Sequence, residues 1–131
     1  MLTPIDLVKK AKSEISECSN EELCQAIDNK AIVIDVREPG EHAQGYIAHA
    51  INAPRGLIEF AIFDHPRIKP AIQKNPAETP IYLYCKSGGR SALAAQSLQT
   101  LGFNKVYSLA GGIQGWESAG LKVNTEDSYQ Y

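Results

Sequence analysis

The sequence has few cysteines, no long apolar run and almost no net charge, and each shortage excludes a class of protein. Its cysteines are three in number, at positions 18, 24 and 85, so we expect no disulfide framework. No apolar stretch approaches the ~20 residues that a membrane-spanning helix needs. Residues 1–6 lack a basic region followed by an apolar run, and we therefore expect no signal peptide.

The net charge and the length restrict the possible partners and the number of domains. A net charge of −2 gives no reason to expect nucleic acid or an anionic membrane as a partner. The 131 residues, of which 44% are hydrophobic, are typical of one soluble domain. We predict a single domain over residues 1–131, with a core at about 15–121 and a loose tail at 122–131. A reducing cytoplasm fits the unpaired cysteines.

Metal chemistry is not predicted either. His42 and His49 lie seven residues apart without other ligand types at useful spacing. A structural zinc site needs about four nitrogen or sulfur ligands, and the sequence offers no such set. Each of these histidines is therefore interpreted as a surface or half-buried residue.

Apolar runs and amphipathic segments alternate along the chain. The runs predicted as strands are 15–18, 31–36, 50–53, 81–84 and 105–109. The segments predicted as helices are 3–13, 19–28, 57–63, 90–101 and one that begins near 110. This alternation predicts an α/β layer fold with a mostly parallel sheet. Segment 57–63 is apolar nearly all round and is predicted to be well buried, whereas four of the seven prolines leave segment 64–80 room for a short turn or helix.

The sequence also predicts the buried face and the C-terminal end of the helix at 90–101. Ala94, Leu98 and Leu101 are predicted to share its buried face. Gly102 stands where a left-handed glycine commonly ends a helix, and Phe103 stands where such an end places an apolar contact. Trp116, in the last predicted helix, is interpreted as a core anchor.

A loop of unusual composition follows the strand at 81–84. Cys85 is the first residue beyond the carboxyl end of this strand, where open α/β sheets bind ligands. Gly88 and Gly89 allow the backbone to curl so that successive N–H groups form an anion-binding nest. Lys86 and Arg90 add positive charge. These features indicate that Cys85 is a reactive thiolate, the nucleophilic form of cysteine. They argue against the alternative that Cys85 only packs in the core as a small hydrophobic residue.

Three motifs resemble those of the rhodanese-type sulfurtransferases. They are the loop CKSGGRS at 85–91, the segment IDVREPGE at 34–41 and the segment GGIQGW at 111–116. The resemblance implies a three-layer domain with about five strands and helices on both faces of the sheet. Two positions depart from the family pattern: Tyr46 replaces a common histidine, and His49 stands where glycine is usual.

The resemblance also implies an activity, thiosulfate sulfurtransfer. The Cys85 thiolate would attack the outer sulfur of an anionic donor such as thiosulfate and become a persulfide. Cyanide, a thiol or a protein would then accept that sulfur, without any metal or organic cofactor. Lys86 and Arg90 would attract the donor, and the loop N–H groups would hold the persulfide. The implied substrate-binding residues are Lys86, Ser87, Gly88, Gly89, Arg90 and Ser91.

Two alternatives remain open from the sequence. The first is a cysteine phosphatase or arsenate reductase, which resembles this loop but spaces its residues as Cys-x5-Arg, whereas Cys85 and Arg90 are one residue closer. The second is a rhodanese-like module that carries sulfur or binds partners without useful turnover. The retained Cys85 and the intact loop argue against an inactive domain.

Other reactive side chains are given structural interpretations. Asp35 and Arg37 stand at the end of a predicted strand, where a structural ion pair or loop tie is expected. Cys18 and Cys24 are six residues apart and form no CxxC pair, so both are interpreted as buried structural thiols.

Overall fold

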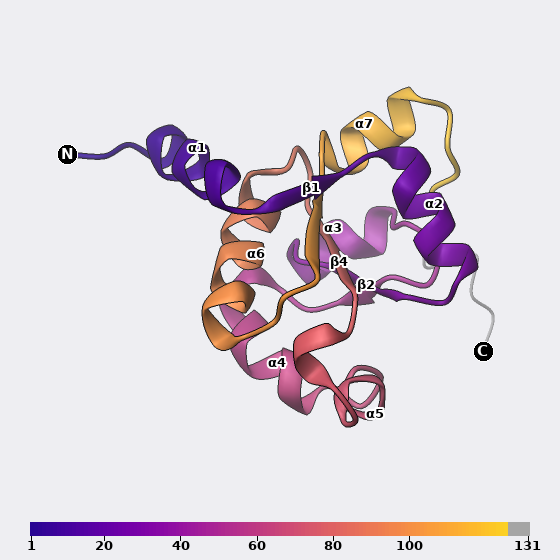
Figure 1. The fold of residues 1–131 in the computed structure, drawn as a ribbon. Helices are drawn as coiled ribbons and strands as arrows, with labels where there is room; N and C mark the ends of the chain where they lie inside the picture. Colours follow the sequence, from indigo (N-terminus) through magenta and orange to yellow (C-terminus); the bar gives the residue numbers. More distant parts are fainter. Residues whose placement is uncertain (126–131) are drawn as a thin grey trace.

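The computed structural model describes residues 1–125, and parallel strands form the centre of the fold (Figure 1). The strands are β1 (Ser16–Cys18), β2 (Ile32–Asp35), β3 (Ile51–Asn52), β4 (Ile81–Tyr84) and β5 (Val106–Leu109). They form one five-stranded sheet in the order β1-β5-β4-β2-β3, and all of their pairings are parallel. The predicted α/β fold with a five-stranded parallel sheet is confirmed, and β4 lies at its centre.

Helices cover both faces of this sheet (Figure 1). On one face lie α2 (Asn20–Asp28) and α7 (Gly112–Ser118), and on the other lie α4 (Ile58–Asp64), α5 (Lys69–Ile72) and α6 (Gly89–Leu101). The remaining elements are α1 (Pro4–Glu14), α3 (Pro39–Gln44), η1 (Arg55–Leu57) and η2 (Pro76–Glu78). Adjacent residues of β2 point to opposite cores, as strand geometry requires: Ile34 to that of α6, Val33 to that of α2.

Local sequence signals fix several helix ends. Thr3 caps α1 and Ser19 caps α2, each within a reciprocal capping box. At the C-terminal end of α6, Gly102 adopts a φ of +112°, and the Phe103 N–H donates to the Leu98 carbonyl over 3.1 Å. This is the glycine-terminated end predicted for this helix.

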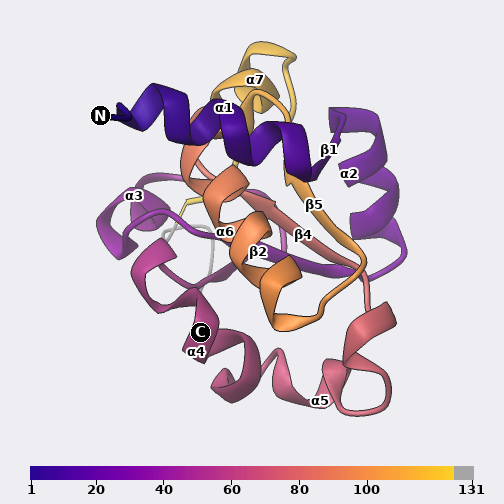
Figure 2. The ribbon, with the colours of Figure 1, turned by 60° about the vertical axis from the view of Figure 1, so that its left-hand side comes forward.

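Two predictions about the buried faces of helices are wrong. The helix predicted at 57–63 buries Ile58 and Ile62 completely, but Phe60 is 70% exposed. This helix, α4, lies at the periphery, where only one of its faces can meet the sheet and α6 (Figure 2). Leu101 is 45% exposed, because it belongs to the last turn of α6, and small residues such as Ala94 line the face that packs on the sheet.

The proline-rich segment 64–80 contains α5 and η2, in agreement with the short elements predicted there. It lies at the end of the sheet opposite the loop that follows β4 (Figure 1). Among residues 1–125, no helix is long and apolar enough to cross a membrane.

The first residues of the predicted tail are tied to the domain. The Trp116 ring N–H donates to the Lys122 carbonyl over 2.9 Å, and Asn124 pairs with Tyr46 in an antiparallel bridge. Residues 126–131 lie outside the described part of the chain. Trp116 itself is 5% exposed, which confirms its interpretation as a core anchor. Cys18 is buried as predicted, whereas Cys24 is only half-buried.

The start of α7 packs directly against the loop that follows β4. The Ile113 N–H donates to the carbonyl of Cys85 over 2.9 Å, and the Gln114 N–H donates to that of Lys86 over 3.0 Å. Gly112 makes this approach possible, because its φ is +59° and it has no side chain to strike the loop. The N–H groups of Ile113 and Gln114 therefore hold the loop at 85–90 in place, and Gly112 allows the close approach.

We expect Gly112→Ala to lower the free energy of unfolding by about 2–4 kcal/mol, because it combines backbone strain with overlap. The new Cβ would lie 2.7 Å from the Cys85 carbonyl oxygen and closer still to that of Lys86. Gly120→Ala is the matched control, since Gly120 has a φ of +80° but nothing within 4 Å of the new Cβ. It should cost about 1 kcal/mol. Equal losses for both variants in urea unfolding would show that the close contact is unimportant.

Candidate active site

Cys85 follows β4 directly, and only 1% of its surface is exposed. The loop beyond it turns at Gly88, whose φ of +108° suits glycine alone. This turn allows the Gly88 N–H to donate to the Cys85 sulfur over 3.1 Å. The carbonyls of Cys85 and Lys86 accept hydrogen bonds from the start of α7, which fixes this part of the loop. The loop therefore curls around the sulfur as the sequence predicts.

Two buried hydroxyl groups form a chain that ends at this sulfur. The Ser91 oxygen lies 3.5 Å from the Cys85 sulfur and 2.7 Å from the Ser108 oxygen, and neither serine is exposed to solvent. A thiolate can only accept hydrogen bonds, so in that state Ser91 donates to the sulfur and accepts from Ser108. These two hydroxyl groups thus supply the sulfur with a neutral hydrogen-bond donor from inside the protein.

Opposing effects set the pKa of Cys85. Burial raises it, but hydrogen bonds from the Ser91 hydroxyl and from the N–H groups of Ser91, Gly88 and Ser87 together lower it by more. The pKa therefore falls below the ordinary value of a cysteine. Cys18 shows the contrast, since burial raises its pKa to about 12. The loop cysteine is therefore more readily ionised than Cys18, and the thiolate is the nucleophile.

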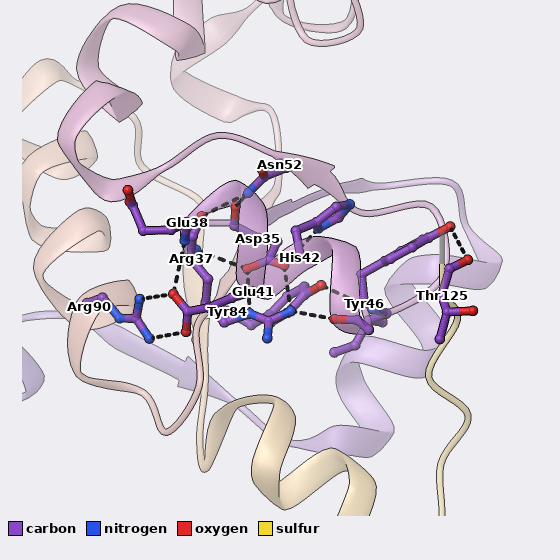
Figure 3. A network of polar contacts seen from close by, with 12 residues as sticks. Asp35, Arg37, Glu38, Glu41, His42, Tyr46, Asn52, Tyr84, Arg90 and Thr125 are labelled. Atoms are coloured by element: carbon purple, nitrogen blue, oxygen red, sulfur yellow. Dashed lines mark hydrogen bonds and ion pairs between the residues drawn. The ribbon is translucent and has the colours of Figure 1, made fainter. Parts of the chain in front are cut away.

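Arg90 is paired with a carboxylate rather than left free. Its two guanidinium nitrogens donate to Glu41 of α3 over 2.7 and 2.9 Å (Figure 3). These hydrogen bonds lower the pKa of Glu41 to about 2. The pair ties the loop to α3, and most of the Arg90 charge is matched locally. Lys86 is exposed, so the largest effects that favour the thiolate come from neutral donors.

The predicted ion pair at the end of β2 is confirmed. Arg37 donates to both carboxylate oxygens of Asp35, over 3.0 and 2.8 Å, and to the Gly45 carbonyl over 2.6 Å (Figure 3). His42 brings its ring nitrogen Nδ1 within 2.8 Å of the same carboxylate. Burial raises the pKa of Asp35, but the hydrogen bonds from His42 and Arg37 lower it by more. Asp35 is thus an ionised anchor that joins β2 to α3.

The two departures from the family pattern have structural explanations. His49 adopts a φ of +66°, which costs a residue with a Cβ about 1 kcal/mol and which glycine adopts freely. Tyr46 is 3% exposed and stacks on the His42 ring with the centroids 4.4 Å apart (Figure 3). Tyr46 therefore packs against α3 through His42.

A cavity of about 530 Å³ opens beside Cys85. Residues of the loop and of α6 form one side of it, and the N-terminal segment with α1 forms the other. A Cβ built at Gly89 would lie 3.5 Å from a methyl group of Val8, so α1 passes within one side chain of the loop. Within residues 1–125, no group of three or more His, Cys, Asp or Glu side chains is placed to hold a metal ion.

Three parts of this site were not foreseen from the sequence. Ser108 lies in a strand predicted as apolar, and a serine within the run Val106–Leu109 was the available signal. The pairing of Glu41 with Arg90 joins positions 49 residues apart, which spacing alone does not reveal. No motif in the sequence indicates that α1 lies beside the loop.

Comparison with known proteins agrees with this geometry. The model of the rhodanese-like domain matches residues 19–119. The chain is 31% identical over 111 residues to a sulfurtransferase from Allochromatium vinosum. The aligned region covers 83% of this chain and 94% of that protein. The chain is also 31% identical over 121 residues to a tRNA uridine(34) hydroxylase from Chlamydia trachomatis, covering 92% of this chain but 35% of that protein.

Solved structures give the same picture. A human single-domain sulfurtransferase superimposes with a TM-score of 0.67 at 28% identity, covering 78% of this chain and 95% of that one. A Rhodopseudomonas palustris protein of unknown function, described as a possible tyrosine phosphatase, superimposes with a TM-score of 0.79 at 27% identity. That match covers 95% of this chain and 96% of the other. With the family match extending from α2 to α7, the chain belongs to the rhodanese-like domain family.

Proposed function

We propose that the protein is a sulfurtransferase that moves a sulfane sulfur from thiosulfate or a related anion through a persulfide on Cys85. One observation carries the proposal: a cysteine whose pKa is lowered by surrounding donors lies beside an open cavity. Membership of the rhodanese-like family and the similarity to sulfurtransferases of like length support it.

In the first step the Cys85 thiolate attacks the outer sulfur of thiosulfate. A new S–S bond forms on Cys85, the S–S bond of the donor breaks, and sulfite leaves with the electron pair. The terminal sulfur of the persulfide carries the negative charge that the thiolate has lost. We expect the Gly88 N–H and the Ser91 hydroxyl to stabilise that charge, because both lie at the adjoining Cys85 sulfur.

In the second step a nucleophile attacks the terminal sulfur of the persulfide. Cyanide would leave as thiocyanate and a thiolate as a new persulfide, and in both cases the Cys85 thiolate is the leaving group. The same donors that lower the Cys85 pKa make it a better leaving group. The exposed Lys86 would attract anionic donors from solution, an effect that salt screens over about 8–10 Å.

The role of Cys85 is tested by substitution. Cys85→Ser should abolish persulfide formation with thiosulfate, seen by intact mass, and reduce thiocyanate production by at least about a thousandfold. Cys24→Ser is the control with the same chemical change outside the loop, and it should retain turnover. Near-UV circular dichroism checks that each variant is folded. Turnover like that of the wild type by folded Cys85→Ser would overturn the proposal.

The hydroxyl chain gives a pH prediction with a fixed sign. Because the Cys85 pKa is lowered, its alkylation by iodoacetamide should rise with pH to a plateau whose midpoint lies below that of an ordinary cysteine. Ser91→Ala removes the largest lowering contribution, so its midpoint should move to higher pH. Ser108→Ala should shift the midpoint in the same direction and by less, because Ser91 keeps its own hydrogen bond to the sulfur.

Ser97→Ala is the matched control for these two variants. Ser97 lies on the same helix as Ser91, but its hydroxyl donates to Glu59 instead of the sulfur. Its profile should coincide with that of the wild type. Identical midpoints for Ser91→Ala and Ser97→Ala would show that the hydroxyl does not stabilise the thiolate.

A phosphatase activity is the second candidate, because a close structural neighbour is described as a possible tyrosine phosphatase. Hydrolysis of a phosphate ester on this loop would need an arginine that reaches over several phosphoryl oxygens at once. Here Arg90 is held by two hydrogen bonds to Glu41, and it follows Cys85 one residue sooner than in the Cys-x5-Arg spacing. We therefore expect persulfide formation and no hydrolysis of p-nitrophenyl phosphate. Hydrolysis that depends on Cys85, without any persulfide detectable by mass, would favour the phosphatase.

A further inference from the structure

The cavity beside Cys85 has a mostly apolar wall that the reacting loop does not provide. Four side chains of the N-terminal segment form this wall, and Leu93 of α6 completes it opposite them. The four are Leu2, Pro4, Leu7 and Val8. The family match begins at residue 19, so the four residues of the N-terminal segment lie outside it, whereas Leu93 lies within it. We call this set of five residues the apolar wall.

The apolar wall is open to solvent in the free protein. Leu2 is 66% exposed and Leu7 is 43% exposed, although both line the cavity. Leucine side chains left in water at a cavity mouth gain stability when an apolar group covers them. The position of the two leucines therefore fits contact with a bound molecule.

The charges of the cavity favour the same kind of molecule. Among the lining residues, all within the described part of the chain, Arg90 is the only one besides the Cys85 thiolate that carries a charge, and Glu41 already pairs with it. A volume of about 530 Å³ lies within the usual range for organic ligands and far exceeds a small inorganic anion. The donor anion needs only the loop donors, so the apolar wall is left to contact the body of the acceptor.

We infer that the sulfur acceptor is a thiol with an apolar body, which the apolar wall binds while the thiolate faces Cys85. This inference rests on the proposed function. The acceptor thiolate attacks the terminal sulfur, the S–S bond of the Cys85 persulfide breaks, and the acceptor leaves as a persulfide. Residues 2–8 then determine acceptor selectivity, whereas the loop determines the chemistry.

The test compares two thiols of similar acidity, benzyl mercaptan and 2-mercaptoethanol. The protein is loaded with thiosulfate and desalted, and the loss of one sulfur is followed by intact mass. We expect the wild type to prefer benzyl mercaptan by about tenfold. Leu7→Ser should lower this preference about fivefold, because part of the apolar contact is lost. Leu2→Ser should act in the same direction, and Leu2 lies outside α1, which begins at Pro4.

Leu101→Ser is the matched control. Leu101 is 45% exposed, close to the 43% of Leu7, but it lies at the far end of α6 and does not line the cavity. Its preference between the two thiols should equal that of the wild type. The inference is overturned when the wild type shows no preference, or when Leu2→Ser and Leu7→Ser both keep the preference of the wild type.

A second measurement needs no sulfur transfer. Benzyl alcohol, which occupies the same space but cannot react, should slow the alkylation of Cys85 by iodoacetamide in the wild type and in Leu101→Ser. Little protection should remain in Leu7→Ser. Absence of protection in the wild type overturns the apolar site. Failure to form a persulfide, with protection still present, instead overturns the proposed function and with it the acceptor role.

Discussion

The site depends on one constraint: a sulfur that is almost completely buried must still carry negative charge. Burial by itself raises the pKa of a thiol, as Cys18 shows, and would leave Cys85 unreactive. Hydrogen-bond donors reverse the balance at Cys85, namely the Ser91 hydroxyl and the N–H groups of the loop. Neutral donors suit this purpose because they add no buried charge that would itself need a partner.

The rest of the fold keeps these donors aimed at the sulfur. The start of α7 binds the carbonyls of the loop, and the absence of a side chain at Gly112 allows that approach. Glu41 holds Arg90 from the side of α3, and the Asp35–Arg37 pair fixes α3 to the end of β2. The three sequence motifs thus meet at one end of the sheet, although 43 residues separate the first two along the chain at their nearest ends and 19 the last two. Each motif supports the same loop.

The sequence predicted well what neighbouring residues decide. The helix starts predicted at residues 3 and 19 and the helix end predicted at Gly102 are local patterns, and the structure contains each of them. Predictions of burial failed where packing partners decide the outcome. Phe60 is 70% exposed because α4 meets the rest of the protein along one face only, and no periodicity in seven residues could show which face has a neighbour.

The sequence by itself determined the succession of strands and helices along the chain, the position of Cys85 after a buried strand and the turn at Gly88. All of these follow from local composition. Only the tertiary structure decided which groups surround the sulfur. Ser108 reaches Ser91 from the neighbouring strand, Glu41 reaches Arg90 from α3, and Leu7 reaches the cavity from α1. Such contacts join residues far apart in the chain, and their partners are chosen by the packing of helices on the sheet, which a pattern along the sequence does not specify.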